Sequence, residues 1–380
     1  MDYRDTPDEA AFRHQLRGWL AETKVPNWKD ADSISEAQRR MRIWNKALHD
    51  AGYLAIGWPT EEGGQGLSPI FNLILNDEIG KADCPPYPGW INIFPRAISI
   101  HGTDAQRERF VPATLDGEII WCQGFSEPGA GSDIASMSTR AVRSEGGWII
   151  SGQKLWTTSV IYADWCFLLA RTDDSVSKHR GISAFLVSLD SPGITAGAVE
   201  LANGNPETGQ LFLDDVFVPD DQMLGGEGDG WRIALSTFSY ERNPVETEYI
   251  SELRQWMRSA EQLASDLGKL DDIHVRRRLA DIRTRIDGLV YVGLEQLSAR
   301  VAEGRVYPGE ESSVGKLLWT YAGQEMQHFV LDLLGSRPLA DPQYNPMGDY
   351  IWSRVLSVFG GTEQIQKNVL AWRVLGLPRV

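Results

Sequence analysis

The spacing of apolar residues predicts helices in the first third of the chain. Residues 6–9 (Thr-Pro-Asp-Glu) have the pattern of a capping box, with a Thr N-cap, Pro at the first helical position and Glu three residues after the cap. Apolar residues from Phe12 to Leu20 follow at helical spacing. Residues 38–51 and 68–81 are predicted to form two further helices.

The pattern changes near Ile119 to short apolar stretches separated by Gly, Pro, Asp and Ser. Short apolar runs between turn-forming residues are typical of β-strands in an antiparallel sheet. We therefore expect the middle third of the chain to be a β domain. The predicted strands include residues 147–152, 164–171, 182–189 and 210–219.

The helical period returns beyond the glycines at 225–230. One apolar stripe runs from Leu279 to Leu297, and a second runs from Val314 to Val330. Stripes this long indicate helices that pack together in a bundle. The order of helices, strands and helices predicts three domains, at residues 1–118, 119–226 and 227–380.

The composition narrows the function classes. A formal net charge of -15 argues against binding to a nucleic-acid backbone or an anionic membrane. The first residues lack the basic start and apolar core of a secretory signal, and no apolar run approaches the roughly 20 residues that span a bilayer, so we expect a cytoplasmic protein. Three cysteines without a pairing pattern and six scattered histidines predict buried free thiols and no metal site.

The most informative segment is residues 121–133, WCQGFSEPGAGSD. Its Gly-Ala-Gly run permits close approach to the backbone, while Ser126, Ser132 and Asp133 add hydrogen-bonding groups. Such a loop can hold a phosphate or the polar edge of a ring, and it can equally be a simple turn. It is not a dinucleotide-binding fingerprint, because no G-x-G-x-x-G follows a strand and opens a helix here.

Three motifs, in this order, resemble those of the acyl-CoA dehydrogenase family. Residues 124–133 (GFSEPGAGSD) are similar to the first family signature, and residues 156–158 (WTT) resemble its Trp-x-Thr flavin contact. Residues 359–366 (FGGTEQIQ) are similar to its third motif. The resemblance covers essentially the whole chain. It implies FAD as the cofactor and a mainly α fold with a β domain, comprising an N-terminal helical domain, a middle antiparallel β domain and a C-terminal four-helix bundle.

The resemblance also assigns residues to the cofactor. The first motif would line one side of the isoalloxazine ring, and Ser132 would lie near the pyrophosphate and the pantetheine arm. The Trp-x-Thr motif would cover the flavin, with the Thr158 hydroxyl near N5. A buried flavin needs such a set, because its polar edge requires hydrogen bonds while its faces require apolar contact. The implied cofactor-binding residues are Gln123, Gly124, Phe125, Ser126, Ser132, Trp156, Thr157, Thr158, Thr362 and Gln364.

The family's reaction needs a carboxylate that takes the pro-R hydrogen from Cα while hydride leaves Cβ for flavin N5. In much of the family this carboxylate immediately precedes the Gly-Thr of the third motif, where this chain has Gly360. A minority places the base in a Glu-Arg pair on another helix, which the Glu241-Arg242 pair resembles. We therefore assign Glu241 as the catalytic base. The alternatives are a solvated Glu241 that merely pairs with an arginine, or another acid: Glu246, Glu248 or Glu363.

The surroundings of Glu241 bear on the substrate. Pro244 removes the helical donor for the Tyr240 carbonyl, so we expect a bend that either aims Glu241 inward or only serves packing. Burial in an apolar site should raise the pKa of Glu241 toward what Cα proton abstraction needs. The resemblance implies that the backbone N–H of Gly360 and a flavin ribityl hydroxyl bind the thioester carbonyl. The implied substrate-binding residues are Ser132, Arg242, Gly360 and Gly361.

Other positions depart from the homomeric members of the family, in which a neighbouring subunit completes the FAD site with an arginine and a Gln-x-x-Gly-Gly segment. Here the corresponding residues 332–336 read DLLGS. The arginine is expected in an Arg-x-x-Phe motif, but neither Arg254 nor Arg258 has a Phe three residues later. An Asp would repel a pyrophosphate. This asymmetry, and the stretch 178–183 (KHRGIS), resemble the heteromeric α2β2 acyl-CoA dehydrogenases of actinobacterial steroid side-chain breakdown.

We therefore expect an oxidoreductase that dehydrogenates an acyl-CoA, by analogy a steroid side-chain CoA, and passes electrons to an electron-transferring flavoprotein. Its partner would be a related subunit, or else it would form a homotetramer. One alternative is a non-catalytic partner subunit, against which Ser126, Trp156, Thr158 and Glu241 argue. A second alternative is a flavin monooxygenase or oxidase on the same fold, because a fold does not fix a function. The net charge disfavours a nucleic-acid-binding relative.

Overall fold

The structure is a computed structural model that describes residues 4–24, 33–204, 208–243, 247–305, 308–336 and 346–379. They separate into two compact units. The first unit takes the described parts of 1–26, 55–90 and 239–380, and the second takes those of 27–54 and 91–238. Among these residues no helix is long and apolar enough to cross a membrane.

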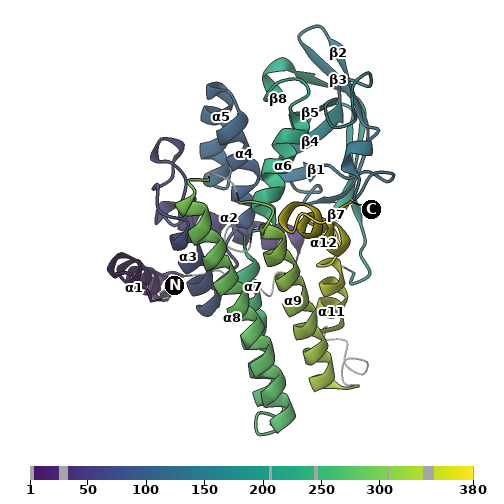
Figure 1. The fold of residues 1–380 in the computed structure, drawn as a ribbon. Coiled ribbons are helices and arrows are strands. Elements are labelled where there is room, and N and C mark those ends of the chain that lie inside the picture. Colours follow the sequence, from purple (N-terminus) through teal and green to yellow (C-terminus); the bar gives the residue numbers. More distant parts are fainter. Residues whose placement is uncertain are drawn as a thin grey trace. The chain divides into compact units, whose positions relative to one another are not determined.

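The first unit is helical (Figure 1). Helices α7, α8, α9 and α11 pack against one another as the predicted four-helix bundle. The stripe predicted for α8 faces its interior, because Ile282 and Ile286 are buried in the core. The stripe predicted for α9 was wrong, because Val314 and Leu317 are only partly buried and Tyr321 is exposed. The buried face of α9 instead carries Trp319 and Met326. The elements are α1 (Pro7–Glu22), α3 (Ile70–Lys81), α7 (Tyr249–Asp266), α8 (Ile273–Ala302), α9 (Ser312–Leu334), α11 (Pro346–Val355), α12 (Glu363–Val369), the 3-10 turn Thr60–Glu62 and the π-helical turn Leu370–Val374.

Local signals explain where several helices begin. The predicted capping box is confirmed: Thr6 N–H donates to Glu9 Oε2 at 2.8 Å, and Glu9 N–H donates to Thr6 Oγ1 at 3.3 Å. The second predicted helix begins four residues before the expected Gln38, because the Ser33 hydroxyl caps it by accepting from Glu36 N–H. Helix boundaries therefore follow the capping residues more closely than they follow the apolar period.

The second unit combines helices with the β sheet (Figure 1). Helix α6 begins in this unit, and its last turn belongs to the first. The helical elements are α2 (Ile34–Asp50), α4 (Phe94–His101), α5 (Asp104–Leu115), α6 (Gly230–Glu241) and the 3-10 turns Ile134–Ser136 and Asp220–Gln222. A further 3-10 turn, Gly89–Asn92, lies at a boundary between the units.

The sheet has the strand order β6-β7-β3-β2-β4-β5-β8, and β1 pairs with β4. Most pairs are antiparallel, as predicted, but β4 is parallel to both β1 and β2. Strand β3 extends six residues beyond the expected Gly152 and so carries the WTT motif at its end. The strands are β1 (Trp121–Gly124), β2 (Arg140–Ser144), β3 (Gly147–Thr158), β4 (Trp165–Arg171), β5 (Ile182–Ser188), β6 (Ile194–Val199), β7 (Thr208–Pro219) and β8 (Met223–Leu224).

Candidate functional site

The first motif leaves the sheet at the end of β1, which carries Gln123 and Gly124. Only glycine fits at position 124, because a Cβ there would lie 2.7 Å from Cys166 Sγ. Phe125 is buried against the rings of Phe167 and Phe238, at centroid distances of 5.7 and 5.8 Å. The start of the loop is therefore fixed by close packing against the sheet.

A buried ion pair holds the next part of the loop. Lys154 Nζ lies 2.8 Å from Glu127 Oε1 and also donates to the carbonyl of Phe125, and both charged side chains are almost fully buried. The carboxylate also accepts hydrogen bonds from Ser138 N–H, Ser138 Oγ and Thr139 N–H. Burial alone would raise the pKa of Glu127, but Lys154 and these donors lower it to about 2. The loop between Phe125 and Thr139 is thus held in place by the buried Glu127 carboxylate and its partners.

The WTT motif lies at a bulge in β3. The register with β7 shifts between Leu155 and Thr157, and Trp156 adopts a left-handed backbone with φ +61°. This conformation is unfavourable for a residue with a side chain, and such strain is concentrated at functional sites. It leaves the Trp156 side chain 56 % exposed.

The neighbouring threonines differ in their surroundings. Thr158 is exposed, whereas Thr157 is fully buried and its Oγ1 has no hydrogen-bond partner within the described residues. A buried hydroxyl without a hydrogen-bond partner costs free energy, which a polar ligand atom could offset by bonding to it. An exposed aromatic face, an unpaired hydroxyl and the anchored loop fit a planar cofactor with a polar edge.

Ser132 is exposed on the same loop, one residue before Asp133. Asp133 Oδ2 lies 2.6 Å from Lys178 Nζ and accepts a hydrogen bond from Ser136. Lys178 begins the 178–183 stretch singled out in the sequence. The ion pair therefore places that stretch beside the loop, and it leaves the Ser132 side chain open to solvent.

In the helical unit, Glu241 is the last residue of α6. Its side chain is partly buried, and its carbonyl accepts a hydrogen bond from Tyr249 OH at 2.7 Å. Burial raises the pKa of Glu241 above that of an ordinary glutamate, while the charges of Arg242 and Lys316 act in the opposite direction. This is the direction expected for a carboxylate that takes a proton from carbon.

The Glu241 carboxylate lies against the third motif. A Cβ built on Gly360 would lie 3.2 Å from Glu241 Oε1, so glycine leaves room for the carboxylate. Gly360 and Gly361 both have left-handed backbones, with φ of +64° and +89°. Arg242 Nε donates to the Gly360 carbonyl at 3.2 Å, and Gln366 Nε2 donates to the same oxygen at 2.9 Å. Arg242, which is distant in sequence, and Gln366, six residues away, thus both hold the turn beside Glu241.

The alternative acids are less suited to the role of base. Glu363 begins α12, accepts a hydrogen bond from Tyr321 OH at 2.8 Å and pairs with Lys367, so a phenol and an ammonium group already engage it. Glu248 precedes the first residue of α7. Glu246 and Pro244 lie outside the described residues, and the bend expected from Pro244 stays a prediction. Helix α6 ends at Glu241, before Pro244, and the Tyr240 carbonyl accepts a hydrogen bond from Asn243 N–H.

The remaining motif residues occupy the start of α12. Thr362 is its N-cap, and its hydroxyl accepts from Ile365 N–H at 3.2 Å. Gln364 is exposed. The local role of Thr362 is therefore structural, and contacts of both residues with a cofactor stay predictions.

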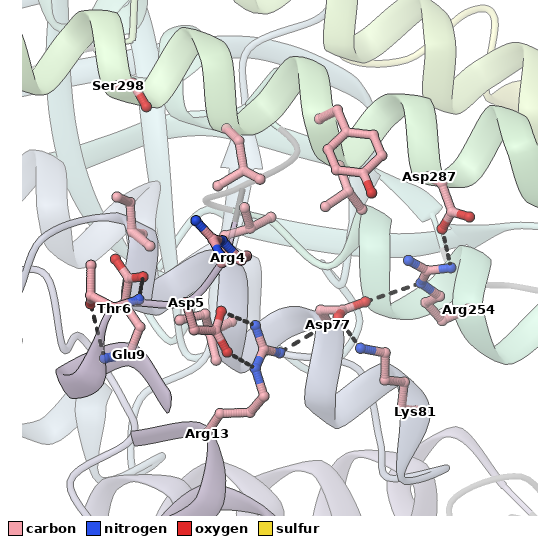
Figure 2. A pocket seen from close by; sticks show the side chains of 16 residues that line it. Arg4, Asp5, Thr6, Glu9, Arg13, Asp77, Lys81, Arg254, Asp287 and Ser298 are labelled. Carbon is pink, nitrogen blue, oxygen red and sulfur yellow. Dashed lines mark hydrogen bonds and ion pairs between the residues drawn. The ribbon is translucent and has the colours of Figure 1, made fainter. Parts of the chain in front are cut away.

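A separate cavity of about 440 Å³ lies among α1, α3, α7 and α8 (Figure 2). Its charged side chains point toward one another: Arg13 lies 2.7 Å from Asp5, and Arg254 lies 3.0 Å from Asp77 and 2.7 Å from Asp287. Because these charged side chains pair with one another, they are already engaged and less suited to bind a charged ligand. None of the motif residues lines this cavity.

Arg254, Arg258 and Asp332, the residues at the positions that differ from homomeric members of the family, all form ion pairs. Arg254 belongs to the cavity network just described, and Arg258 Nη2 lies 3.1 Å from Asp83. Asp332, near the end of α9, pairs with Arg278, which also lies 2.8 Å from Glu325. The segment that corresponds to Gln-x-x-Gly-Gly therefore presents an ion-paired acid in place of an amide.

Comparisons with known proteins match three adjoining domain models. They are the N-terminal, middle and C-terminal domains of acyl-CoA dehydrogenase, at residues 6–118, 122–216 and 228–375. The chain belongs to the acyl-CoA dehydrogenase family. This family is one of oxidoreductases whose members generally bind FAD. The confirmed resemblance therefore also supports the fold of helices, β sheet and helices described above.

Individual relatives and solved structures are similar to nearly the whole chain. The acyl-CoA dehydrogenase IpdE1 of Mycobacterium tuberculosis is 34 % identical, and the match covers 98 % of each chain. Among solved structures, the Tcur3481-Tcur3483 steroid ACAD is 26 % identical with a TM-score of 0.85. The ChsE4-ChsE5 complex from Mycobacterium tuberculosis is 28 % identical with a TM-score of 0.84, and both structural matches cover 100 % of each chain.

The structure adds residues that the sequence motifs did not assign to the site. Gln366 is fully buried and bonds the carbonyls of Gly360 and Gly361. Tyr249 and Lys316 lie close to Glu241 from α7 and α9. A lysine within the apolar stripe of 314–330 is the signal that could have revealed Lys316, because buried lysines are rare.

Proposed function

We propose that this chain catalyses the FAD-dependent α,β-dehydrogenation of an acyl-CoA thioester, with Glu241 as the base that removes the α-proton. The observation that carries the proposal is the position of the carboxylate: Glu241 Oε1 lies 3.2 Å from the place that a Cβ on residue 360 would take. By resemblance, residue 360 is where much of the family carries its catalytic carboxylate. The two arrangements would therefore deliver an acid to the same place from different points of the chain.

The chain's own residues fit this chemistry. Burial makes Glu241 a stronger base than an exposed glutamate. The Gly360 N–H makes no hydrogen bond among the described residues, so it is available to a thioester carbonyl whose oxygen gains charge as the proton leaves. Arg242 and Gln366 hydrogen-bond the Gly360 carbonyl and so hold the turn to which that N–H belongs. A contact of Arg242 with the CoA moiety, and one of Gly361 or Ser132 with substrate, are further parts of the proposal.

The β unit would hold the cofactor. Gln123, Gly124, Phe125 and Ser126 would line the ring, Ser132 would lie near the pyrophosphate, and Trp156, Thr157 and Thr158 would cover and hydrogen-bond it. Bound FAD would supply the two-electron acceptor for the hydride that leaves Cβ. The exposed Trp156 and the unpaired Thr157 hydroxyl support this assignment.

The test compares two conservative variants of the FAD-loaded enzyme. Glu241→Gln removes the base while keeping its size, and we expect turnover to fall by about two to four orders of magnitude with unchanged flavin content. Glu363→Gln, in the third motif, is the matched control and should retain near-native turnover. A Glu241→Gln variant with native turnover would reject this assignment. Absence of turnover in the wild-type complex would favour the non-catalytic partner subunit.

For the substrate, we propose an acyl-CoA with a bulky ring system, as in steroid side-chain catabolism. The support is the similarity to a structure described as a steroid ACAD. Turnover would be compared on cholanoyl-CoA, octanoyl-CoA and isovaleryl-CoA, with a ferrocenium acceptor and with an electron-transferring flavoprotein as the proposed natural acceptor. We expect the highest kcat/KM on cholanoyl-CoA, and a preference for octanoyl-CoA would contradict this part. Fast turnover with oxygen alone would indicate an oxidase.

For the assembly, we propose an α2β2 heterotetramer with a related subunit in the cytoplasm. The ion-paired Asp332 and the engaged Arg254 support it, because neither offers the groups that a pyrophosphate needs. We expect the chain expressed alone to retain little flavin, and co-expression with the product of the neighbouring gene to give yellow protein. A fully flavin-loaded homotetramer from single expression would exclude this assembly.

A further inference from the structure

A buried lysine stands close to the proposed base. Lys316 of α9 is 1 % exposed, and its ammonium group donates a hydrogen bond to the Leu356 carbonyl at 2.7 Å. Thr320 Oγ1 donates to the same oxygen at 3.0 Å. Leu356 lies at the start of the turn that leads to Gly360, so this hydrogen bond ties α9 to that turn.

Aromatic rings form the rest of the lysine's surroundings. Its Nζ lies 4.2 Å from the ring centroid of Phe359, 4.3 Å from that of Trp319 and 5.9 Å from that of Tyr249. The rings of Tyr249 and Trp319 stack at 3.7 Å. The electron-rich faces of such rings attract a cation, and they exclude water that would screen its charge. The field of this ammonium group therefore reaches further than that of a surface lysine.

Lys316 and Glu241 meet at Gly360. A Cβ built on Gly360 would lie 3.2 Å from Glu241 Oε1 and 3.5 Å from Lys316 Cε. A side chain at position 360 would therefore crowd both groups. The glycine thus allows the lysine to approach the carboxylate, while the hydrogen bond to Leu356 keeps the lysine out of a direct ion pair.

We propose that Lys316 is a positioning residue for Glu241, whose ammonium group supplies the counter-charge for the carboxylate and holds the turn that carries Gly360. The proposal rests on the assignment of Glu241 as the base and adds to it a second cation that, with Arg242, favours the ionised form of this base. A lysine at hydrogen-bond distance would weaken the base by stabilising its charge strongly. A lysine held slightly further away favours ionisation and leaves the carboxylate free to take a proton.

The titration of the two groups agrees with this arrangement. Burial lowers the pKa of Lys316 to about 7, against the opposing charge of Glu241. The lysine is therefore charged below neutral pH, which is the range in which a glutamate of raised pKa would otherwise take up a proton. The charged and titratable groups that face this pair from its own and neighbouring elements are Arg242, Glu248, Tyr249, Glu252 and, beside Arg242, Arg373.

The test measures the ionisation of Glu241 directly. Infrared difference spectra of the FAD-loaded complex, without substrate, would follow the carboxylate band that Glu241→Gln removes. We expect Lys316→Met, which keeps the apolar stem, to move the titration of this band to higher pH. Lys367→Met, a surface lysine paired with Glu363, is the matched control and should leave it in place. An unchanged Glu241 titration in a folded Lys316→Met variant would overturn the proposal.

A kinetic readout separates this role from a purely structural one. For each pH unit by which the Glu241 titration rises, α-proton abstraction at low pH should fall about tenfold, because the ionised fraction falls by that factor. The loss should disappear at high pH, where Glu241 is ionised in both proteins. Lys316→Arg keeps the charge and should restore much of the low-pH rate. A loss that is equal at all pH values would contradict the proposal.

The reciprocal measurement applies if Lys316→Met does not fold. In protein labelled with carbon-13 at the lysine ε-carbons, the Lys316 signal is assigned by its loss in Lys316→Arg. Linkage requires that Glu241→Gln lowers the pH at which Lys316 titrates, and an unchanged titration would overturn the coupling. Because these titrations need no substrate, they decide the coupling even if turnover shows that another residue is the base.

Discussion

Replacing Lys154 by Met would test how the flavin-side loop is held. The change removes the ammonium group that lies 2.8 Å from Glu127, with both side chains at most 2 % exposed. The carboxylate would keep three donors, from Ser138 N–H, Ser138 Oγ and Thr139 N–H, at 2.6, 2.7 and 2.9 Å. Breaking a buried ion pair costs about 3–5 kcal/mol, and we expect about 3 kcal/mol here because these donors remain.

The matched variants separate the ion pair from the packing. Glu127→Gln should cost at least as much, since it leaves the buried Lys154 charge without a counter-charge and with a hydrogen bond to the Phe125 carbonyl. The double variant should cost only about 1–2 kcal/mol, because neither charge is then buried alone. A double-mutant cycle would thus give a coupling energy of at least about 4 kcal/mol.

The assay is equilibrium urea unfolding, followed by circular dichroism and fluorescence, together with the flavin content of each purified variant. We expect the loss of stability in Lys154→Met to be accompanied by loss of bound FAD. The pKa of Glu127 is held at about 2, so the stabilisation is complete above the ordinary glutamate range and is lost as the pH falls toward that value. A Lys154→Met variant within about 1 kcal/mol of wild type at neutral pH would refute the reasoning.

Two further predictions concern Glu241. Gly360→Ala should lower turnover at least about tenfold, because the new Cβ would lie 3.2 Å from Glu241 Oε1. The control is Gly268→Ala, at a glycine with the same φ of +64° and no atom within 4 Å of the new Cβ. It should carry the same backbone strain of roughly 1–2 kcal/mol without loss of turnover. Equal kinetic effects of the two substitutions would contradict the contact. Because burial raises the pKa of Glu241 and the base must be ionised, the rate of α-proton abstraction should fall as the pH drops through a value above the ordinary glutamate range of about 4.3. A pH–rate profile that stays flat down to that range would contradict it.

Local rules in the sequence predicted the fold well. The capping box at Thr6, the apolar stripe of α8 and the short strands of the middle segment all depend on residues close together in the chain. The parallel pairing of β1 with β4 could not be predicted in this way, because Cys122 and Cys166 are brought together by the sheet and not by a turn. The domain boundaries at 118 and 226 stay predictions.

Only some residues of the site around Glu241 could be predicted from the sequence motifs. The motifs mark Glu241 and Gly360 separately, but the contact between their neighbourhoods spans 118 residues and follows from the packing of helices. Lys316 escaped notice because a lysine in an apolar helical segment usually extends its ammonium group to solvent, whereas here Leu356 and three aromatic rings bind it in the interior. Gln366 was visible within the third motif, but its role depends on the left-handed turn at Gly360 and Gly361.

The central claim, that the Glu241 carboxylate removes the α-proton, can be tested without hydride transfer. Acetyl-CoA has α-hydrogens but no β-carbon, so its exchange with deuterated water on the FAD-loaded enzyme, followed by NMR, reports proton abstraction alone. We predict measurable exchange for the wild-type enzyme and for Glu363→Gln, and a rate lower by about two to four orders of magnitude for Glu241→Gln. Exchange at the wild-type rate in Glu241→Gln would contradict the account.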